Sequence, residues 1–404
     1  MADHHSCSCF RPSEFSCPFP ARRRANLCVV RTFRRDNVRI VVTGGGTGGH
    51  IYPAFSIIKR MKERHPSAEV LYIGTERGLE RELAPKSGVP CAFLRVEGLQ
   101  RRVSARAFKT MFLAGTSFFS ARRILKRFRP DVVIGTGGYV VLPVLLAART
   151  LGVPSAVLEL DAFAGLSNRL SGRFVNTVLL GMEAGKAFFQ KAPRVVVTGN
   201  PRATEVLAVC EDEIARVCRT LGLDRSRPIV TILGGSRGAR PINDAVFELL
   251  EKPRAHREQI VWITGQVHYE AICQRRSTMP VQKDVFILPY MDEMPALLSA
   301  TTVLISRAGA TILAELTALG VPAILIPSPY VTHHHQDYNA QALEAQGAAV
   351  VLSEASLAQG MLATQLSALL ANPIRLEGMH KASQRMGKPD ALTRIADEIE
   401  RLLA

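Results

Sequence analysis

Short apolar runs alternate with helical patterns from Val38 onward, in two consecutive series. The first series lies at residues 39–43, 70–73, 92–96, 132–134, 155–158, 177–180 and 195–197. The second lies at 229–233, 260–264, 285–288, 303–305, 323–327 and 349–352. Runs that are apolar throughout are typical of parallel strands buried on both faces by helices. The pattern therefore predicts an α/β protein with two doubly wound, Rossmann-like domains.

The stretch "TGNPRAT" at residues 198–204 brings glycine and proline together and interrupts the pattern. We therefore expect a first domain at 38–201 and a second at 202–386. A last helix is expected at about 391–403, within a segment, 387–404, that packs back on the first domain. Residues 1–37 show neither the two-residue period of a strand nor the 3.6-residue period of a helix. They carry seven arginines against three acidic residues. They are interpreted as a basic disordered tail or as a start assigned too far upstream.

The charge of the chain limits the class of partner. A formal net charge of +16 favours anionic partners, namely phosphates, nucleic acid or an anionic membrane. No apolar run approaches the ~18 residues that span a bilayer. The cysteines lack metal-ligand spacing, which fits reduced thiols in a cytosolic protein.

Glycine-rich loops follow predicted strands at residues 44–49, 135–138 and 234–238. The first, "GGGTGGH", contains a G-x-G-x-x-G pattern, but the next strand ends in Ile73-Gly74-Thr75, with Glu76 only beyond it. No Walker lysine follows either. We expect this loop to approach a ligand closely and a helix starting at Ile51 to face an anion. A tight turn without a ligand is the alternative.

The second domain has its own candidates. Ser236 and the amides around it are placed to hold a phosphate at a helix start. Glu315 lies where a carboxylate accepts the two hydroxyls of a ribose, with a surface salt bridge as the alternative. Gln336 and Asn339 share one helix face, which suits sugar hydroxyls or, alternatively, helix capping.

The motifs together resemble one enzyme family. "GGTGGHIYPA", "PDVVIGTGGYVVLP", "AGLSNRL", "GNP", "GGSRGAR", "SRAGATILAELTALGVPAILIPSPY" and "HQDYNA" stand in the order found in the peptidoglycan N-acetylglucosaminyltransferases that convert lipid I to lipid II. The resemblance covers residues 38 to the C-terminus. It implies a GT-B fold, with two Rossmann-like domains facing each other across a cleft. It also implies inverting transfer from UDP-N-acetylglucosamine, without a metal or other cofactor.

Position by position, the resemblance implies roles for individual residues. His50 is the candidate general base for the acceptor 4-hydroxyl, since neutral imidazole titrates in the right range. If His50 only holds the loop, Glu159 or Asp161 would supply the base. The other implied contacts are with the donor: Thr47, Gly48 and Gly49 line its site, Ser236 approaches the phosphates, the backbone of Met291 meets the uracil, Ala310, Thr311, Ile312, Leu313, Ala314 and Glu315 hold diphosphate and ribose, and Gln336 binds the sugar with Asn339 nearby.

Two stretches depart from the family. Where the family has H-E-Q-N, this chain has Leu-Glu-Leu-Asp, so that Glu159 is kept and Asp161 replaces a donor-site asparagine. The family's arginine two residues past the Gly-Asn-Pro proline is Ala203 here, and Arg202 stands one position earlier. Asp161 and Arg202 are kept as substrate-binding candidates. The departures leave open a related GT-B transferase that uses another UDP-sugar or another lipid acceptor, such as diacylglycerol.

A lipid-linked acceptor requires a membrane face. Residues 99–129 carry nine arginines or lysines and no acidic residue, together with large apolar side chains at Phe108, Met111, Phe112, Phe118 and Phe119. Such a segment suits a peripheral contact with an anionic membrane, which the resemblance places at the cytoplasmic face of the bacterial inner membrane. An ordinary helix packed on the first sheet is the alternative. A nucleic-acid-binding protein is less favoured, because no module for it is recognisable.

Overall fold

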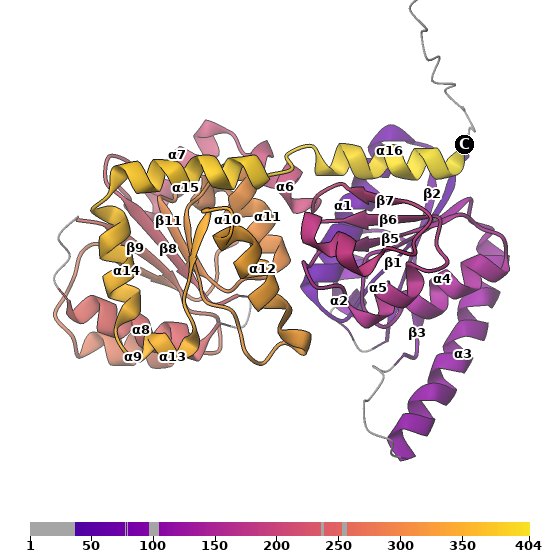
Figure 1. Cartoon of the computed structure of the whole chain (residues 1–404), viewed down its shortest axis with the longest axis horizontal. Helices are drawn as coiled ribbons and strands as arrows, with labels where there is room; N and C mark the ends of the chain where they lie inside the picture. Colours follow the sequence, from indigo (N-terminus) through magenta and orange to yellow (C-terminus); the bar gives the residue numbers. More distant parts are fainter. Residues whose placement is uncertain (1–36, 77, 79, 97–104, 236–237, 253–256) are drawn as a thin grey trace, which may run out of the picture. The chain divides into compact units, whose positions relative to one another are not determined.

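The computed structural model describes residues 37–404 except 77, 79, 97–104, 236–237 and 253–256, and it contains two parallel sheets (Figure 1). The first has the order β3-β2-β1-β4-β5-β6-β7 and the second β10-β9-β8-β11-β12-β13. The predicted fold class is confirmed, and the strands lie where the apolar runs predict them. They are β1 Arg39–Thr43, β2 Glu69–Thr75, β3 Cys91–Leu94, β4 Val132–Gly135, β5 Ser155–Glu159, β6 Thr177–Leu180, β7 Val195–Val197, β8 Ile229–Leu233, β9 Gln259–Ile263, β10 Val285–Leu288, β11 Val303–Ser306, β12 Ala323–Leu325 and β13 Ala349–Val351.

Helices connect the strands and cover the sheets. Around the first sheet they are α1 Gly48–Arg64, α2 Glu80–Lys86, α3 Ala105–Phe128, α4 Val141–Thr150, α5 Leu166–Ser171 and the 3-10 turn η1 Glu183–Phe188. Between β7 and β8 in the sequence come α6 Arg202–Glu205 and η2 Val206–Ala208. The second sheet has α7 Glu211–Leu221, α8 Arg240–Glu251, α9 Tyr269–Ser277, α10 Met294–Ala300, α11 Ala310–Leu319, η3 Thr332–His334, α12 His335–Glu344, α13 Glu354–Leu357, α14 Met361–Leu370 and α15 Pro373–Met386, and the chain ends with α16 Ala391–Leu403.

The last helix, α16, contributes to the core of the first domain. Its buried residues Leu392, Ile395 and Ile399 pack in one cluster with β1 and α1. At the edge of this cluster, Arg194 makes two 2.8 Å hydrogen bonds to Glu398 of α16. The apolar face of α16 thus packs on the first sheet, although strands β1 to β7 come much earlier in the sequence.

In each sheet the strand order changes direction between two central strands, β1 and β4 in the first and β8 and β11 in the second. Ligands of open α/β sheets bind beyond the carboxyl ends of strands at such switch points. The predicted glycine-rich loops follow β1, β4 and β8, and α11 follows β11. The fold therefore places the candidate residues at the positions where such sheets bind ligands.

Candidate active site

The junction between β1 and α1 differs in one respect from the prediction. Helix α1 begins at Gly48, three residues before the expected Ile51, and Thr47 is its extended N-cap residue. His50 therefore lies in the first turn of α1, and Gly48 and Gly49 contribute its first amides. The first amides of a helix have no acceptor within the helix, and the dipole there favours negative charge.

The ring of His50 is held by one nitrogen. Its Nδ1 lies 3.1 Å from the carbonyl oxygen of Gly45 and 3.4 Å from Oγ1 of Thr47. A carbonyl oxygen can only accept, so Nδ1 carries the proton in this bond and Nε2 keeps its lone pair. Burial lowers the pKa of His50, while Asp161 acts in the opposite direction. The imidazole is therefore neutral near pH 7.

A second glycine loop makes room for this ring. Gly137 has a φ of +116°, and a Cβ there would lie 2.5 Å from Cδ2 and 2.8 Å from Nε2 of His50. Thr136 donates a 2.8 Å hydrogen bond to the His50 carbonyl. The loop after β4 thus fixes His50 from its backbone and lies directly against its side chain.

Glu80, at the start of α2, holds the first glycine loop, and the sequence interpretation missed it. Its carboxylate accepts hydrogen bonds from the Gly46 amide at 3.2–3.3 Å and from the amide and hydroxyl of Thr75 at 2.9 and 2.5 Å. A Cβ at Gly45 would lie 2.3 Å from this carboxylate. The glycines that Glu80 requires were visible in the sequence, at positions 45, 74 and 78.

Glu76, the acidic residue nearest the end of β2, lies outside this arrangement. Its carboxylate is 3.0 Å from Nε of Arg95, on the surface. The acidic residue nearest the end of β2 is therefore engaged in an exposed ion pair.

Glu159 ends β5 and is buried. Oε1 accepts from the Asp161 amide at 3.1 Å, and Oε2 accepts from the amide of Gly165 at 2.9 Å and from the side chain of Asn168 at 3.1 Å. Burial, followed by the charge of Asp161, raises the pKa of Glu159 to about 7. Its hydrogen bonds all go to the loop after β5 and to α5, which follows it, and this favours a loop-holding role over that of the base.

Asp161 and Asn339, both expected near the donor sugar, contact each other. Asn339 is fully buried, and its Nδ2 donates to Oδ1 of Asp161 at 2.8 Å and to the Ala308 carbonyl at 3.0 Å. Its Oδ1 accepts from the Ala162 amide at 2.7 Å. Next to this contact, Phe163 stacks on Tyr338 with ring centroids 5.0 Å apart. Asn339 therefore links α12 to the loop that follows β5.

Glu315, which is buried, forms an ion pair with the half-buried Arg202. Nε of Arg202 donates to Oε1 of Glu315 at 2.8 Å, and Nη2 lies 2.7 Å from the same oxygen. Burial raises the pKa of Glu315, and Arg202 counteracts the rise. Glu315 is 4% exposed, so the alternative of a surface salt bridge is wrong in its location although the ion pair itself is present.

The remaining donor-site candidates follow strands of the second sheet. Gly309 is the extended N-cap of α11, so the amides of its first turn are available, while the side chain of Leu313 lies in the core. Gln336 accepts a 2.9 Å hydrogen bond from the Ser328 amide through Oε1. Met291 follows β10 and is half-buried, and Ser236 lies outside the described residues. The other candidates on α11 are Ala310, Thr311 and Ile312 in its first turn, and Ala314 at the start of the second.

Helix α3 carries the basic segment expected at a membrane. Among its described side chains, Phe119 is 71% exposed, and Arg123, Lys126 and Arg127 are exposed with it, while Leu125 is buried. The predicted apolar groups at residues 108, 111 and 112 lie outside the described side chains. Within the described part of the chain, no helix is long and apolar enough to span a bilayer.

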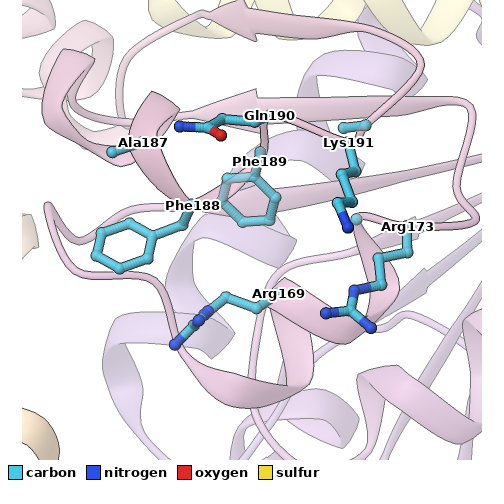
Figure 2. Close-up of a pocket in the computed structure, with 9 residues that line it drawn as sticks. Arg169, Arg173, Ala187, Phe188, Phe189, Gln190 and Lys191 are labelled. Atoms are coloured by element: carbon cyan, nitrogen blue, oxygen red, sulfur yellow. The ribbon is translucent and has the colours of Figure 1, made fainter.

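A further basic pocket lies beside α5, apart from the candidates above. Figure 2 shows Arg169, Arg173 and Lys191 around it together with Phe188. The guanidinium of Arg169 lies 5.2 Å from the centre of the Phe188 ring. No carboxylate among the described residues pairs with these three cations. They add exposed positive charge to the first domain.

Comparisons with known proteins agree with this architecture. The glycosyltransferase family 28 N-terminal domain matches residues 40–180, and the glycosyltransferase family 28 C-terminal domain matches residues 229–395. The crystal structure of Acinetobacter baumannii MurG has a TM-score of 0.73 and 26% identity, over 90% of this chain and 99% of that one.

Two curated relatives are closer in sequence. Both are named UDP-N-acetylglucosamine--N-acetylmuramyl-(pentapeptide) pyrophosphoryl-undecaprenol N-acetylglucosamine transferase. The one from Halalkalibacterium halodurans is 44% identical over 89% of this chain and 98% of its own length. The one from Listeria monocytogenes is 42% identical over 90% and 99%. Near-complete coverage at this identity, with both domains matched, means that the chain belongs to this family of N-acetylglucosamine transferases within glycosyltransferase family 28.

Proposed function

We propose that the protein moves N-acetylglucosamine from UDP-N-acetylglucosamine to the 4-hydroxyl of lipid-linked N-acetylmuramyl-pentapeptide, with inversion at the anomeric carbon. The names of the two curated relatives describe this donor and this acceptor. In the chain itself, the observation that carries the proposal is the position of His50 in the first turn of α1, with Nδ1 3.1 Å from the Gly45 carbonyl oxygen.

The reaction needs a proton acceptor and a site for negative charge. The acceptor hydroxyl attacks the anomeric carbon and loses its proton, while the bond to the UDP oxygen breaks and leaves charge on the diphosphate. His50 Nε2 takes the proton, because Nδ1 is already occupied and the lowered pKa keeps the ring neutral. Amides of Gly48 and Gly49, at the start of α1, favour the developing charge.

In this proposal the second domain, residues 202–386, holds the donor. Glu315 accepts the ribose hydroxyls, the first turn of α11 meets the diphosphate, and Ser236 approaches it from the loop after β8. The backbone of Met291 contacts the uracil, and Gln336 contacts the sugar. Asp161 and Asn339 already satisfy each other, so we assign them to the wall beside the sugar.

We assign the acceptor and the membrane to the first domain, residues 38–201, with residues 387–404 packed on it. On α3, exposed Phe119 stands next to exposed Arg123 and Lys126, one turn and two turns further along the helix. Such a face inserts an aromatic ring while its cations meet anionic head groups. The protein would then act as a peripheral enzyme at the cytoplasmic face of the bacterial plasma membrane.

The test is a transfer assay with the purified full-length protein. Radiolabelled UDP-N-acetylglucosamine and lipid I should give labelled lipid II, and UDP-glucose should be a poor donor. Diacylglycerol in place of lipid I serves as the second acceptor. Labelled diacylglycerol without labelled lipid II would support the related lipid transferase instead and refute the proposal.

A further inference from the structure

Arg202 occupies a position that the family motif does not assign. It begins α6, directly after the Gly-Asn-Pro stretch, where the chain enters the second domain. All three guanidinium nitrogens face carboxylates: Nε and Nη2 approach Oε1 of Glu315, and Nη1 donates to Oε2 of Glu205 at 2.6 Å. Three of its five N–H groups are therefore directed at carboxylates, one from each nitrogen, and these contacts orient the side chain.

The geometry at Glu315 is one-sided. Both contacts from Arg202 fall on Oε1, at 2.8 and 2.7 Å. None of the residues that the structure describes donates a hydrogen bond to Oε2. A carboxylate oxygen accepts two hydrogen bonds, so Oε2 retains the capacity for two hydroxyl donors.

The backbone around Arg202 is attached to the same helix. Its amide donates to Oδ1 of Asn200 at 3.1 Å, and Nδ2 of Asn200 lies 3.4 Å from the carbonyl oxygen of Ala310 in the first turn of α11. Asn200 is 3% exposed. The Arg202 side chain and the backbone that carries it are thus both anchored to α11, the helix that bears Glu315.

We propose that Arg202 is a positioning residue for the donor, which holds one oxygen of Glu315 so that the other faces the ribose hydroxyls. The inference rests on the ribose-binding role of Glu315 in the proposed function. It assigns to Arg202 an indirect role, in contrast to the direct substrate contact expected from the sequence.

Arg202 also sets the charge of its partner. Burial raises the pKa of Glu315, Arg202 counteracts it, and Glu205 adds to the rise. Among the described residues, Arg202 and Glu205 of α6 are the charged groups that act on Glu315; α10, α12 and α15 pack near α11 without adding another. Without Arg202, the pKa of Glu315 should rise further, and a protonated carboxyl should accept hydroxyl hydrogens less well.

The experiment compares two ligands by calorimetry on the full-length protein. UDP carries both ribose hydroxyls, and 2′,3′-dideoxyuridine diphosphate carries neither. Arg202→Gln should weaken UDP binding by about tenfold, the order of one hydrogen bond to a charged group, and should leave the dideoxy ligand unchanged. The loss should shrink as pH rises, because the carboxyl of Glu315 then ionises. Arg202→Lys keeps the charge but not the two contacts, so its loss should be smaller and independent of pH.

Arg225→Gln is the matched control, because it breaks an exposed arginine–glutamate pair of the same domain, with Glu211, away from α11. It should change neither affinity. Equal losses for both ligands in Arg202→Gln, or no loss in either Arg202 variant, would overturn the positioning role. Glu315→Gln separates the two proposals: if it weakens UDP binding while the Arg202 variants do not, only the positioning role fails. If Glu315→Gln itself has no effect, the ribose site is wrong and the positioning role falls with it.

Discussion

Two strand-to-helix junctions of this molecule have the same local geometry and opposite chemistry. After β1, the first turn of α1 carries His50, which is partly accessible and has one nitrogen without a fixed partner in the loop. After β11, helix α11 carries Glu315, which is buried and already paired with Arg202. Both helices follow an extended N-cap residue and offer free amides to an anion.

The difference lies in what the neighbouring elements supply. Around His50 the neighbours are glycines, which leave space at Gly137 and supply a carbonyl at Gly45. Around Glu315 the neighbour is the guanidinium of Arg202, at the start of α6. One junction is therefore suited to exchange a proton during a reaction, and the other to bind a ligand without changing its own charge. The two junctions share a backbone arrangement. The partners of His50 and of Glu315 decide which junction can exchange a proton and which keeps its charge.

The largest effect should follow from removing the reactive group. His50→Ala should lower turnover by ~10²–10⁴ with little change in UDP affinity, since the donor is held at the other junction. The acid limb of the pH–rate profile should lie below the usual histidine range, because burial lowers the pKa of His50 and the base is lost only when the ring is protonated. Steady-state kinetics with lipid I would measure both.

His50→Gln is the companion variant, since it keeps a hydrogen-bonding group but cannot act as a base. Near-normal turnover in this variant would show that His50 only shapes the loop.

Changing Glu315 should affect UDP binding more than turnover. Glu315→Gln should weaken UDP binding by about 1.5–3 kcal/mol, because a charge-assisted hydrogen bond to the ribose is lost. The amide also leaves Arg202 without its buried counter-charge, so thermal unfolding should be followed alongside calorimetry. The comparison of the junctions would fail if UDP affinity stayed the same while turnover fell as it does in His50→Ala.

The variant Glu159→Gln tests whether Glu159, instead of His50, is the general base. Glu159→Gln should lower the free energy of unfolding by about 1–3 kcal/mol, because an amide cannot accept from donors on both sides. The native pKa of about 7 lies above the usual 4.5, so the wild type loses stability as pH rises between these values. The Glu159→Gln variant lacks this pH-dependent loss. The difference in free energy of unfolding between wild type and variant, measured by urea unfolding, should therefore be larger at pH 5 than at pH 8.

Turnover of the folded Glu159→Gln enzyme should stay near that of the wild type. A loss as large as that of His50→Ala would instead move the base to Glu159.

The smallest effect on the reaction should come from α3. Changing Arg122, Arg123, Lys126 and Arg127 to glutamine should reduce binding to anionic vesicles by up to ~1 kcal/mol for each charge that reaches the surface. Activity on a soluble acceptor analogue should be unchanged, since neither junction is touched. Because Arg122 is half-buried, it should contribute least. Vesicle binding that is indifferent to all four changes would place the membrane face elsewhere.

The strands could be predicted because apolar runs are local, and the last helix was predicted with the bounds that the structure gives, Ala391–Leu403. The start of α1 was placed too late, because Gly48 and Gly49 have low helix propensity and their helical state depends on surrounding loops. The partners of the candidate residues could not be predicted. Arg202 and Glu315 are 113 positions apart, and Asp161 and Asn339 are 178 apart. Sequence patterns identify which groups matter, whereas long-range pairing decides which of them remain free.

The position of α16 has a consequence for how the protein is made. The core of the first domain includes Leu392, Ile395 and Ile399, which are synthesised only after the whole second domain. Strands β1 to β7 are synthesised earlier, and the surface that α16 covers stays open until the second domain has been translated. A chain cut between α15 and α16 would keep every glycine-rich loop and still expose this apolar surface, so chaperones and proteases should recognise it.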